Sequence, residues 1–174
     1  MNKEDFQIDA ILIRTEFTDQ RPLRNLPQEL KTKLEPKITE TGSIFIAEDG
    51  EIVYFTLQLT DFRENELVEY TEIAEKLYEL THKHVSIYIL CSNDVDVYMK
   101  VCEIPSEADF TIKLAKSEYN PAKHVLDLIK NKFENNKQIT PEDIHVLARL
   151  PMLCAKKDRN YFRNEYFKIV NQMH

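Results

Sequence analysis

Few side chains in this 174-residue sequence have the types and spacing that chemistry requires. His82 and His84 are two residues apart, which would place both on one face of a strand as a possible metal pair, yet the sequence offers no evident third ligand. We interpret them as surface histidines. Cys91, Cys102 and Cys154 are widely spaced in apolar surroundings, so we expect buried free thiols rather than a disulfide or a metal set.

Composition and charge exclude several classes of protein. The chain holds two glycines, Gly42 and Gly50, so no glycine-rich phosphate loop can be built. No apolar run approaches the ~20 residues of a membrane span, and the start lacks a signal-peptide pattern, so we expect a cytoplasmic protein without a membrane partner.

The net charge of −7 is unevenly distributed along the chain. Residues 1–110 hold 11 Lys and Arg against 23 Asp and Glu, a net of −12, whereas residues 111–174 hold 12 against 7, a net of +5. An acidic body argues against tight, sequence-independent binding of nucleic acid, since that affinity comes mainly from cations at phosphates. The C-terminal part alone could supply a basic face, with Lys156, Lys157 and Arg159 as candidate nucleic-acid contacts.

The elements that must position any site are organised around residues 44–58. Two apolar runs, 44–47 and 52–58, flank a turn centred on Asp49 and Gly50, which is a strong hairpin signal. The second run is apolar on both faces, which is typical of a central strand covered on both sides. We take residues 37–47 as the first arm.

The rest of the sequence predicts a single α/β domain. Asp61 begins an amphipathic helix that ends near Thr81, and the next strand, 85–90, should lie parallel to the second hairpin arm. Two further strands are expected at 97–102 and 110–114. We therefore expect a mixed sheet flanked by helices. The domain is expected to have three parts: an N-terminal segment at 1–35, a sheet core at 37–114 and a helical C-terminal part at 120–174. Within the N-terminal segment, residues 6–17 form a helix or a strand, residues 21–27 are a connector, and a short helix ends before Pro36. One helix of the C-terminal part is expected to end at Pro151.

The order hairpin, helix, parallel strand resembles the PD-(D/E)XK nuclease superfamily, in particular its transposase-like and recombination-promoting branch. The resemblance covers residues 36–153 as a pattern. It rests on Ser43-Ile44-Phe45-Ile46, on Val53-Tyr54-Phe55-Thr56-Leu57-Gln58, on the start of the following helix at 65–70 and on the strand at 86–90. In that family an Asp leads the first strand and a Glu-x-Gln or Glu-x-Lys motif ends the second.

The resemblance implies a catalytic site at Ser43, Thr56 and Gln58, but in a degenerate form. Ser43 stands where the Asp is expected and Thr56 where the Glu is expected, while Gln58 is kept. The family's two carboxylates hold Mg²⁺, and neutral hydroxyls cannot replace their charge. We therefore expect no cofactor, with Mg²⁺ relevant only if the site is active; Glu40 and Asp61 are the candidates for migrated metal ligands.

Two hypotheses for function follow. In the first, the chain is a PD-(D/E)XK nuclease-like protein that is catalytically inactive and either binds DNA weakly through its basic C-terminal part or serves as a binding partner. In the second, it is a non-catalytic interaction module that assembles as a homodimer and has no nucleic-acid role. Neither hypothesis makes the chain an active enzyme.

Overall fold

The hairpin around Asp49 and Gly50 forms and lies within the central sheet. In the computed structural model, which describes residues 7–97, 109–117 and 120–173, β2 (Ser43–Ala47) pairs antiparallel with β3 (Ile52–Gln58). Gly50 adopts φ 88°, a left-handed conformation that favours glycine. All seven residues of β3 are buried, as expected for a strand covered on both faces.

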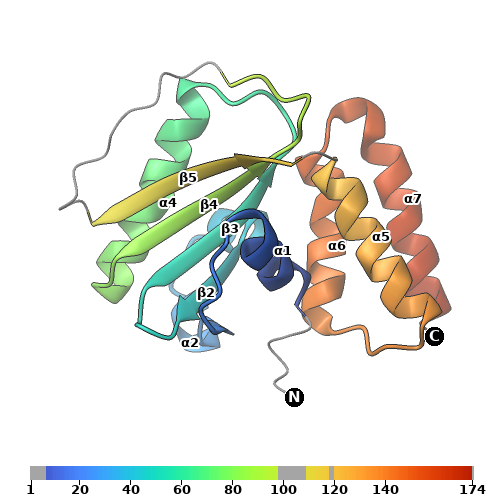
Figure 1. Cartoon of the computed structure of the whole chain (residues 1–174), viewed down its shortest axis with the longest axis horizontal. Coiled ribbons are helices and arrows are strands. Elements are labelled where there is room, and N and C mark those ends of the chain that lie inside the picture. The colour runs from blue at the N-terminus through green and yellow to red at the C-terminus, as the bar shows by residue number, and fades with distance from the viewer. Residues whose placement is uncertain (1–6, 98–108, 118–119, 174) are drawn as a thin grey trace.

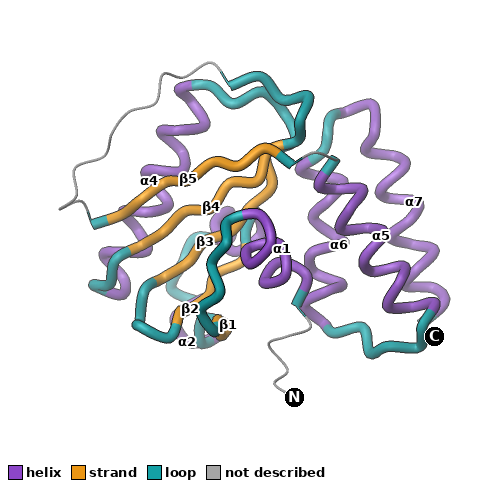
Figure 2. Tube along the Cα trace, in the orientation of Figure 1, coloured by secondary structure: helices purple, strands orange, loops and turns teal. Residues whose placement is uncertain are grey.

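A helical crossover sets the parallel half of the sheet. α4 (Glu64–Thr81) connects β3 to β4 (Val85–Cys91), which lies parallel to β3, and β5 (Phe110–Lys116) lies parallel to β4. A short strand, β1 (Leu23–Asn25), pairs antiparallel with β2. The result is a five-stranded mixed sheet of order β1-β2-β3-β4-β5 (Figure 2), and the predicted mixed α/β fold is confirmed.

Helices cover both faces of the sheet and extend one end of the molecule. In Figure 1, α1 lies in front of the sheet and α4 behind it, while the C-terminal helices stand together at one side. Every helix in the described ranges is too short or too polar to cross a lipid bilayer. Besides α4, the helices are α1 (Ile8–Glu16), α2 (Gln28–Lys31), α3 (Pro36–Thr41), α5 (Pro121–Glu134), α6 (Pro141–Leu153), the 3₁₀ turn η2 (Lys156–Asp158) and α7 (Arg159–Gln172).

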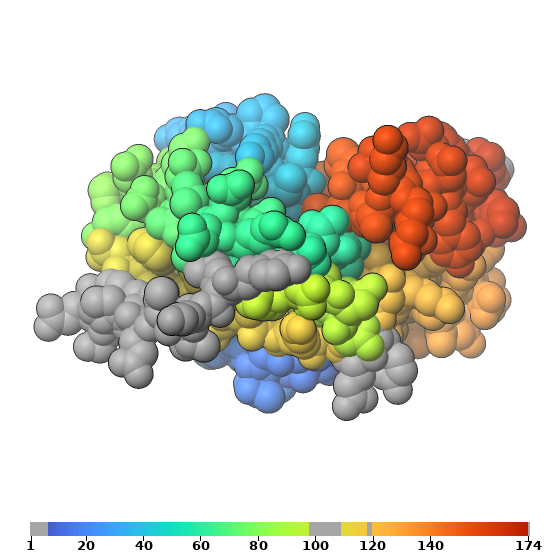
Figure 3. Space-filling model, turned by 90° about the horizontal axis from the view of Figure 1, so that it is seen from above, coloured from blue at the N-terminus to red at the C-terminus, as the bar shows by residue number. Residues whose placement is uncertain are grey.

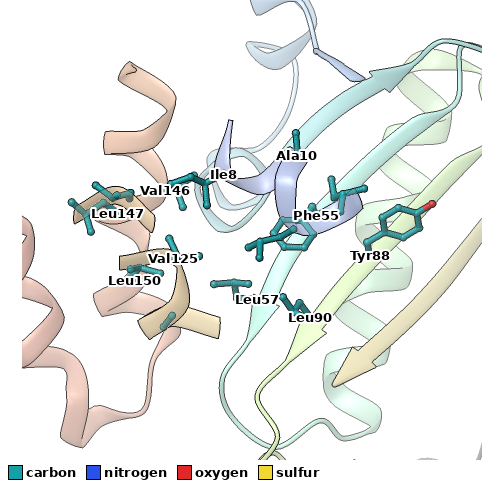
Figure 4. Packing of buried hydrophobic residues seen from close by; sticks show 14 of the residues in the cluster. Ile8, Ala10, Phe55, Leu57, Tyr88, Leu90, Val125, Val146, Leu147 and Leu150 are labelled. Atoms are coloured by element: carbon teal, nitrogen blue, oxygen red, sulfur yellow. The ribbon is translucent and has the colours of Figure 1, made fainter. Parts of the chain in front are cut away.

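Two hydrophobic clusters follow from the alternation of side chains along β3. Phe55 and Leu57 face α1 and the C-terminal helices, where Val125 and Leu150 pack against the same cluster (Figure 4). Tyr54, which directly precedes Phe55, faces the other cluster, beneath α4. The C-terminal helices are therefore joined to the sheet by a continuous apolar core rather than tethered beside it.

Several local predictions are wrong at element ends. Residues 37–41 belong to α3 and not to the first hairpin arm, because Pro36 occupies the first helical turn, where its missing N–H costs nothing. The expected connector at 21–27 contains β1. α6 continues through Pro151 to Leu153 instead of ending there.

The start of α4 also differs from the expectation. Asp61 does not cap this helix; the backbone N–H of Arg63 donates to Glu66 Oε2 at 2.8 Å, and Arg63 is the N-cap residue. Asp61 Oδ1 instead accepts the backbone N–H of Asp96 at 3.2 Å. The strand predicted at 97–102 lies outside the described residues except for Val97, which forms an isolated bridge with Phe62.

Candidate functional site

Thr56 and Gln58 lie at the carboxyl end of β3 with side chains on the α4 face of the sheet. Thr56 is 3% exposed and donates its hydroxyl to the Thr41 carbonyl at 2.7 Å. The Gln58 amide donates to Thr60 at 3.1 Å and accepts the Tyr70 hydroxyl of α4 at 2.8 Å. Burial raises the pKa of Tyr70 far above its ordinary value, so this hydroxyl remains a donor. Both side chains are thus fixed by partners.

Ser43 and Thr56, both expected at one site, project to opposite faces of the strand pair. Ser43 begins β2 directly opposite Phe55, and residues directly opposite in an antiparallel pair project to the same face. Successive side chains alternate, so Thr56 projects to the other face. Ser43 therefore projects toward α1, but Thr56 lies just beyond the start of β2 and lines a small void with Asp9 and Arg149, the two contacts of Ser43.

A buried ion pair that the sequence did not reveal surrounds Ser43. Its hydroxyl donates to Asp9 Oδ2 of α1, and Arg149 Nη2 of α6 lies 2.9 Å from the same oxygen and 3.1 Å from Ser43 Oγ. Asp9 and Arg149 are 3% and 4% exposed. Within the described part of the chain, the Nε and Nη1 atoms of Arg149 have no hydrogen-bond partner. One signal was present in the sequence: each is a charged residue inside an apolar helical run, Ile8–Ile13 and Val146–Leu150.

Two adjoining pockets lie at the carboxyl end of β3. The larger, of about 350 Å³, is lined by Thr56, Gln58 and Tyr70 on one side and by Lys156 and Arg159 on the other. The second, of about 290 Å³, shares the 59–60 backbone region and is lined by Lys157 across from Asp61. We call the two together the β3-end groove. The C-terminal helices that form one wall stand beside the segment that follows β3 (Figure 3).

The groove brings the expected nucleic-acid contacts next to two of the expected site residues. Lys156, Lys157 and Arg159 are exposed in the connection between α6 and α7, roughly a hundred positions beyond β3 in the sequence. Arg159 donates from Nε to the Pro151 carbonyl at 3.0 Å. The 350 Å³ pocket is therefore lined by three cations, two acids and several neutral polar side chains: Lys37, Lys156, Arg159, Glu66, Glu69, Thr41, Thr56, Gln58, Thr60 and Tyr70.

The two acids in the larger pocket each have a partner within the chain. Glu69 pairs with Lys37 at 3.5 Å, and Glu66 is the acceptor at the start of α4. Glu40 lies elsewhere, in a pocket of about 590 Å³ shared with Ser43 and Asp9. Glu40 and Asp61 thus lie in separate pockets and do not converge.

The donor set of the described residues does not fit Mg²⁺. Among these residues no group of three or more His, Cys, Asp or Glu side chains is placed to hold a metal ion. His84 contacts Thr111 at 3.1 Å and lies 3.6 Å from Glu51, whereas His82 ends α4 and packs against Tyr78. The two histidines therefore have separate structural partners.

The cysteines that the structure describes are buried free thiols, as predicted. Burial raises the pKa of Cys91 to about 11 and also raises that of Cys154. A thiol must ionise to act as a nucleophile, so neither is activated for catalysis. Cys102 lies outside the described residues.

Comparison of the chain with protein-family models, with curated proteins and with solved structures found no match in any of the three. The nuclease resemblance therefore remains a prediction that rests on the order of elements and on the residues at the end of β3.

Proposed function

We propose that the chain is a non-catalytic protein on a nuclease-like scaffold, and that it binds nucleic-acid phosphates weakly in the β3-end groove. The observation that carries the proposal is the position of Lys156 and Arg159 beside Thr56 and Gln58 in one pocket. Cations at such a groove attract phosphate oxygens, and the net charge of −7 keeps the interaction weak.

The chemistry of the groove supports binding without cleavage. Metal-assisted hydrolysis of a phosphodiester needs carboxylates that hold a divalent ion and activate water. Thr56 and Gln58 are neutral, and their polar atoms are held by Thr41, Thr60 and Tyr70. Neither Thr56 nor Gln58 is therefore expected to take part in hydrolysis. Binding is therefore expected to be independent of Mg²⁺.

Fluorescence anisotropy with labelled DNA at two salt concentrations tests the proposal. The triple variant Lys156→Gln, Lys157→Gln, Arg159→Gln should weaken binding at low salt. It should also reduce the salt slope, by about 0.9 for each lost contact to duplex DNA and about 0.7 for a single strand. Duplex and single-stranded probes of equal length show which form is preferred.

A matched control holds the change of charge constant. Lys33, Lys83 and Lys137 are exposed and line neither pocket of the groove. Changing these three to Gln removes the same charge and should leave the salt slope close to that of the unaltered protein. Equal effects of the two triple variants would refute the groove as the binding site, and no binding at low salt would refute the function.

Self-association is a second candidate function, favoured by apolar side chains on the last helix. Tyr161 and Phe167 of α7 are 48% and 52% exposed, and Met173, which follows the helix, is 45% exposed. Light scattering during size exclusion should show a concentration-dependent dimer under this alternative, and Phe167→Glu should abolish it. A monomer at all concentrations would refute it.

A further inference from the structure

Arg149 lies between two oxygen-bearing side chains that converge from different elements. Asp9 approaches from α1 and Ser43 from the start of β2, and Arg149 Nη2 contacts both, at 2.9 and 3.1 Å. The Ser43 hydroxyl donates to the Asp9 oxygen that Arg149 contacts. The geometry is that of oxygen atoms grouped around one positive charge, with the charge supplied by the chain itself.

Stability alone is a poor reason for this arrangement. Removing a carboxylate and a guanidinium from water is costly, and apolar side chains of similar size are often equal or better in such a place. The cost is higher here because two nitrogen atoms of Arg149 lack a partner within the described ranges while the side chain is almost fully buried. The role of the cluster is thus better explained by the bringing together of Asp9, Ser43 and Arg149 than by a contribution to the stability of the core.

The place of the cluster in the fold suggests what the guanidinium replaces. Ser43 occupies the position at which the nuclease resemblance expects a metal-binding Asp, and Asp9 is the carboxylate nearest to it in the described contacts. We propose that Arg149 is a resident cation standing in place of a divalent ion, so that Asp9 is neutralised from within the chain. This inference rests on the nuclease-like scaffold proposed above.

Counting charges gives a specific expectation. Asp9 and Arg149 sum to zero, with neutral Ser43 beside them. Ser43→Asp adds a second carboxylate but keeps the guanidinium, so repulsion still opposes a divalent ion. Arg149→Gln removes the guanidinium but leaves one carboxylate. Only the double variant Ser43→Asp/Arg149→Gln presents two carboxylates without a competing cation, which matches the oxygen ligands that Mg²⁺ and Mn²⁺ prefer.

Thermal unfolding in the presence and absence of Mn²⁺ tests the inference. We expect Mn²⁺ to raise the Tm of the double variant and to leave the Tm of the unaltered protein and of Ser43→Asp unchanged. Titration should give the double variant a Kd for Mn²⁺ at least about tenfold lower than that of Ser43→Asp. If the double variant is unfolded alone, recovery of its helical circular dichroism on adding Mn²⁺ is the expected result, because ligand binding then drives folding.

The response to Mn²⁺ also provides a control variant and the results that would contradict the inference. Ser43→Asp/Arg149→Lys keeps a cation while altering the hydrogen bonds, and it should not respond to Mn²⁺; K⁺ at equal ionic strength controls for screening. An equal response of Ser43→Asp and of the double variant would overturn the inference, as would a double variant that Mn²⁺ neither stabilises nor folds. No nucleic acid is present in this experiment, so its failure is distinguishable from a failure of DNA binding in the β3-end groove.

Discussion

Arg149→Met should destabilise the protein by about 3–5 kcal/mol, because it leaves a buried carboxylate without its counter-charge. Asp9 is 3% exposed, and its Oδ2 atom would keep only the Ser43 hydroxyl as partner. Asp9→Leu should have a cost of similar size, since it leaves the guanidinium of Arg149 buried and unpaired. The unfolding free energy of each variant is measured by urea denaturation followed by circular dichroism.

The double variant Asp9→Leu/Arg149→Met decides the origin of that cost. Met keeps the straight aliphatic stem, and Leu keeps the branching of Asp at Cγ, so both charges disappear while the shapes of the side chains are approximately kept. The double variant should lie within about 2 kcal/mol of the unaltered protein, which gives a coupling energy of several kcal/mol across the cycle. Additive costs would refute the reasoning, because they would show that the two side chains act independently.

An exposed pair provides the comparison for this cycle. Lys37 and Glu69 lie 3.5 Å apart with side chains 64% and 57% exposed. Solvent screens such a pair, so the same cycle on these residues should give a coupling energy below about 1 kcal/mol.

Three further substitutions have defined expectations. The Arg21 side chain holds the pKa of Asp19 at about 2 against an ordinary 3.8. The ionised carboxylate should therefore contribute about 2 kcal/mol to the free energy of unfolding above pH 3.8, and this contribution is lost as the pH falls toward 2. Urea melts should show that the stability difference between the unaltered protein and Asp19→Asn shrinks in that pH window. Gly42→Ala places a Cβ 2.2 Å from the Tyr54 ring and should lower Tm by several degrees, whereas an unchanged Tm would contradict the close approach. Thr140→Ala removes the N-cap of α6 and should cost about 1 kcal/mol in a urea melt, with Thr140→Ser as the variant that retains stability.

The sequence predicted the elements whose signals are local. A turn that needs a positive φ at Gly50, and an amphipathic helix ending at Thr81, are each determined within a few residues. The predicted ends of helices were wrong where one residue type can have two roles. Pro36 begins a helix rather than ending one, and Pro151 lies in the last turn of α6, which continues for two residues beyond it.

The candidate site was only half predictable because it depends on pairing across distance. Gln58 and Lys156 line one pocket although no local pattern connects them. Asp9 and Arg149 are 140 positions apart, and their contact follows from the packing of α1 and α6 against one cluster. A charged residue within an apolar helical run was the available signal, and it indicates burial without naming the partner.

Strand register limits how a metal site could arise on this scaffold. Ser43 faces Phe55 across the strand pair, so a carboxylate at position 56 would project toward Tyr70 on the α4 face. Thr56 nevertheless lines a small void of about 10 Å³ together with Asp9 and Arg149, so a carboxylate at this position would also lie close to the buried ion pair. The β3 residue directly opposite Ser43 is Phe55, which is 1% exposed in the core, and a charge there would be buried among apolar side chains. An acid pair at Ser43 or at position 56 would therefore lie beside Asp9, where Arg149 already supplies the positive charge.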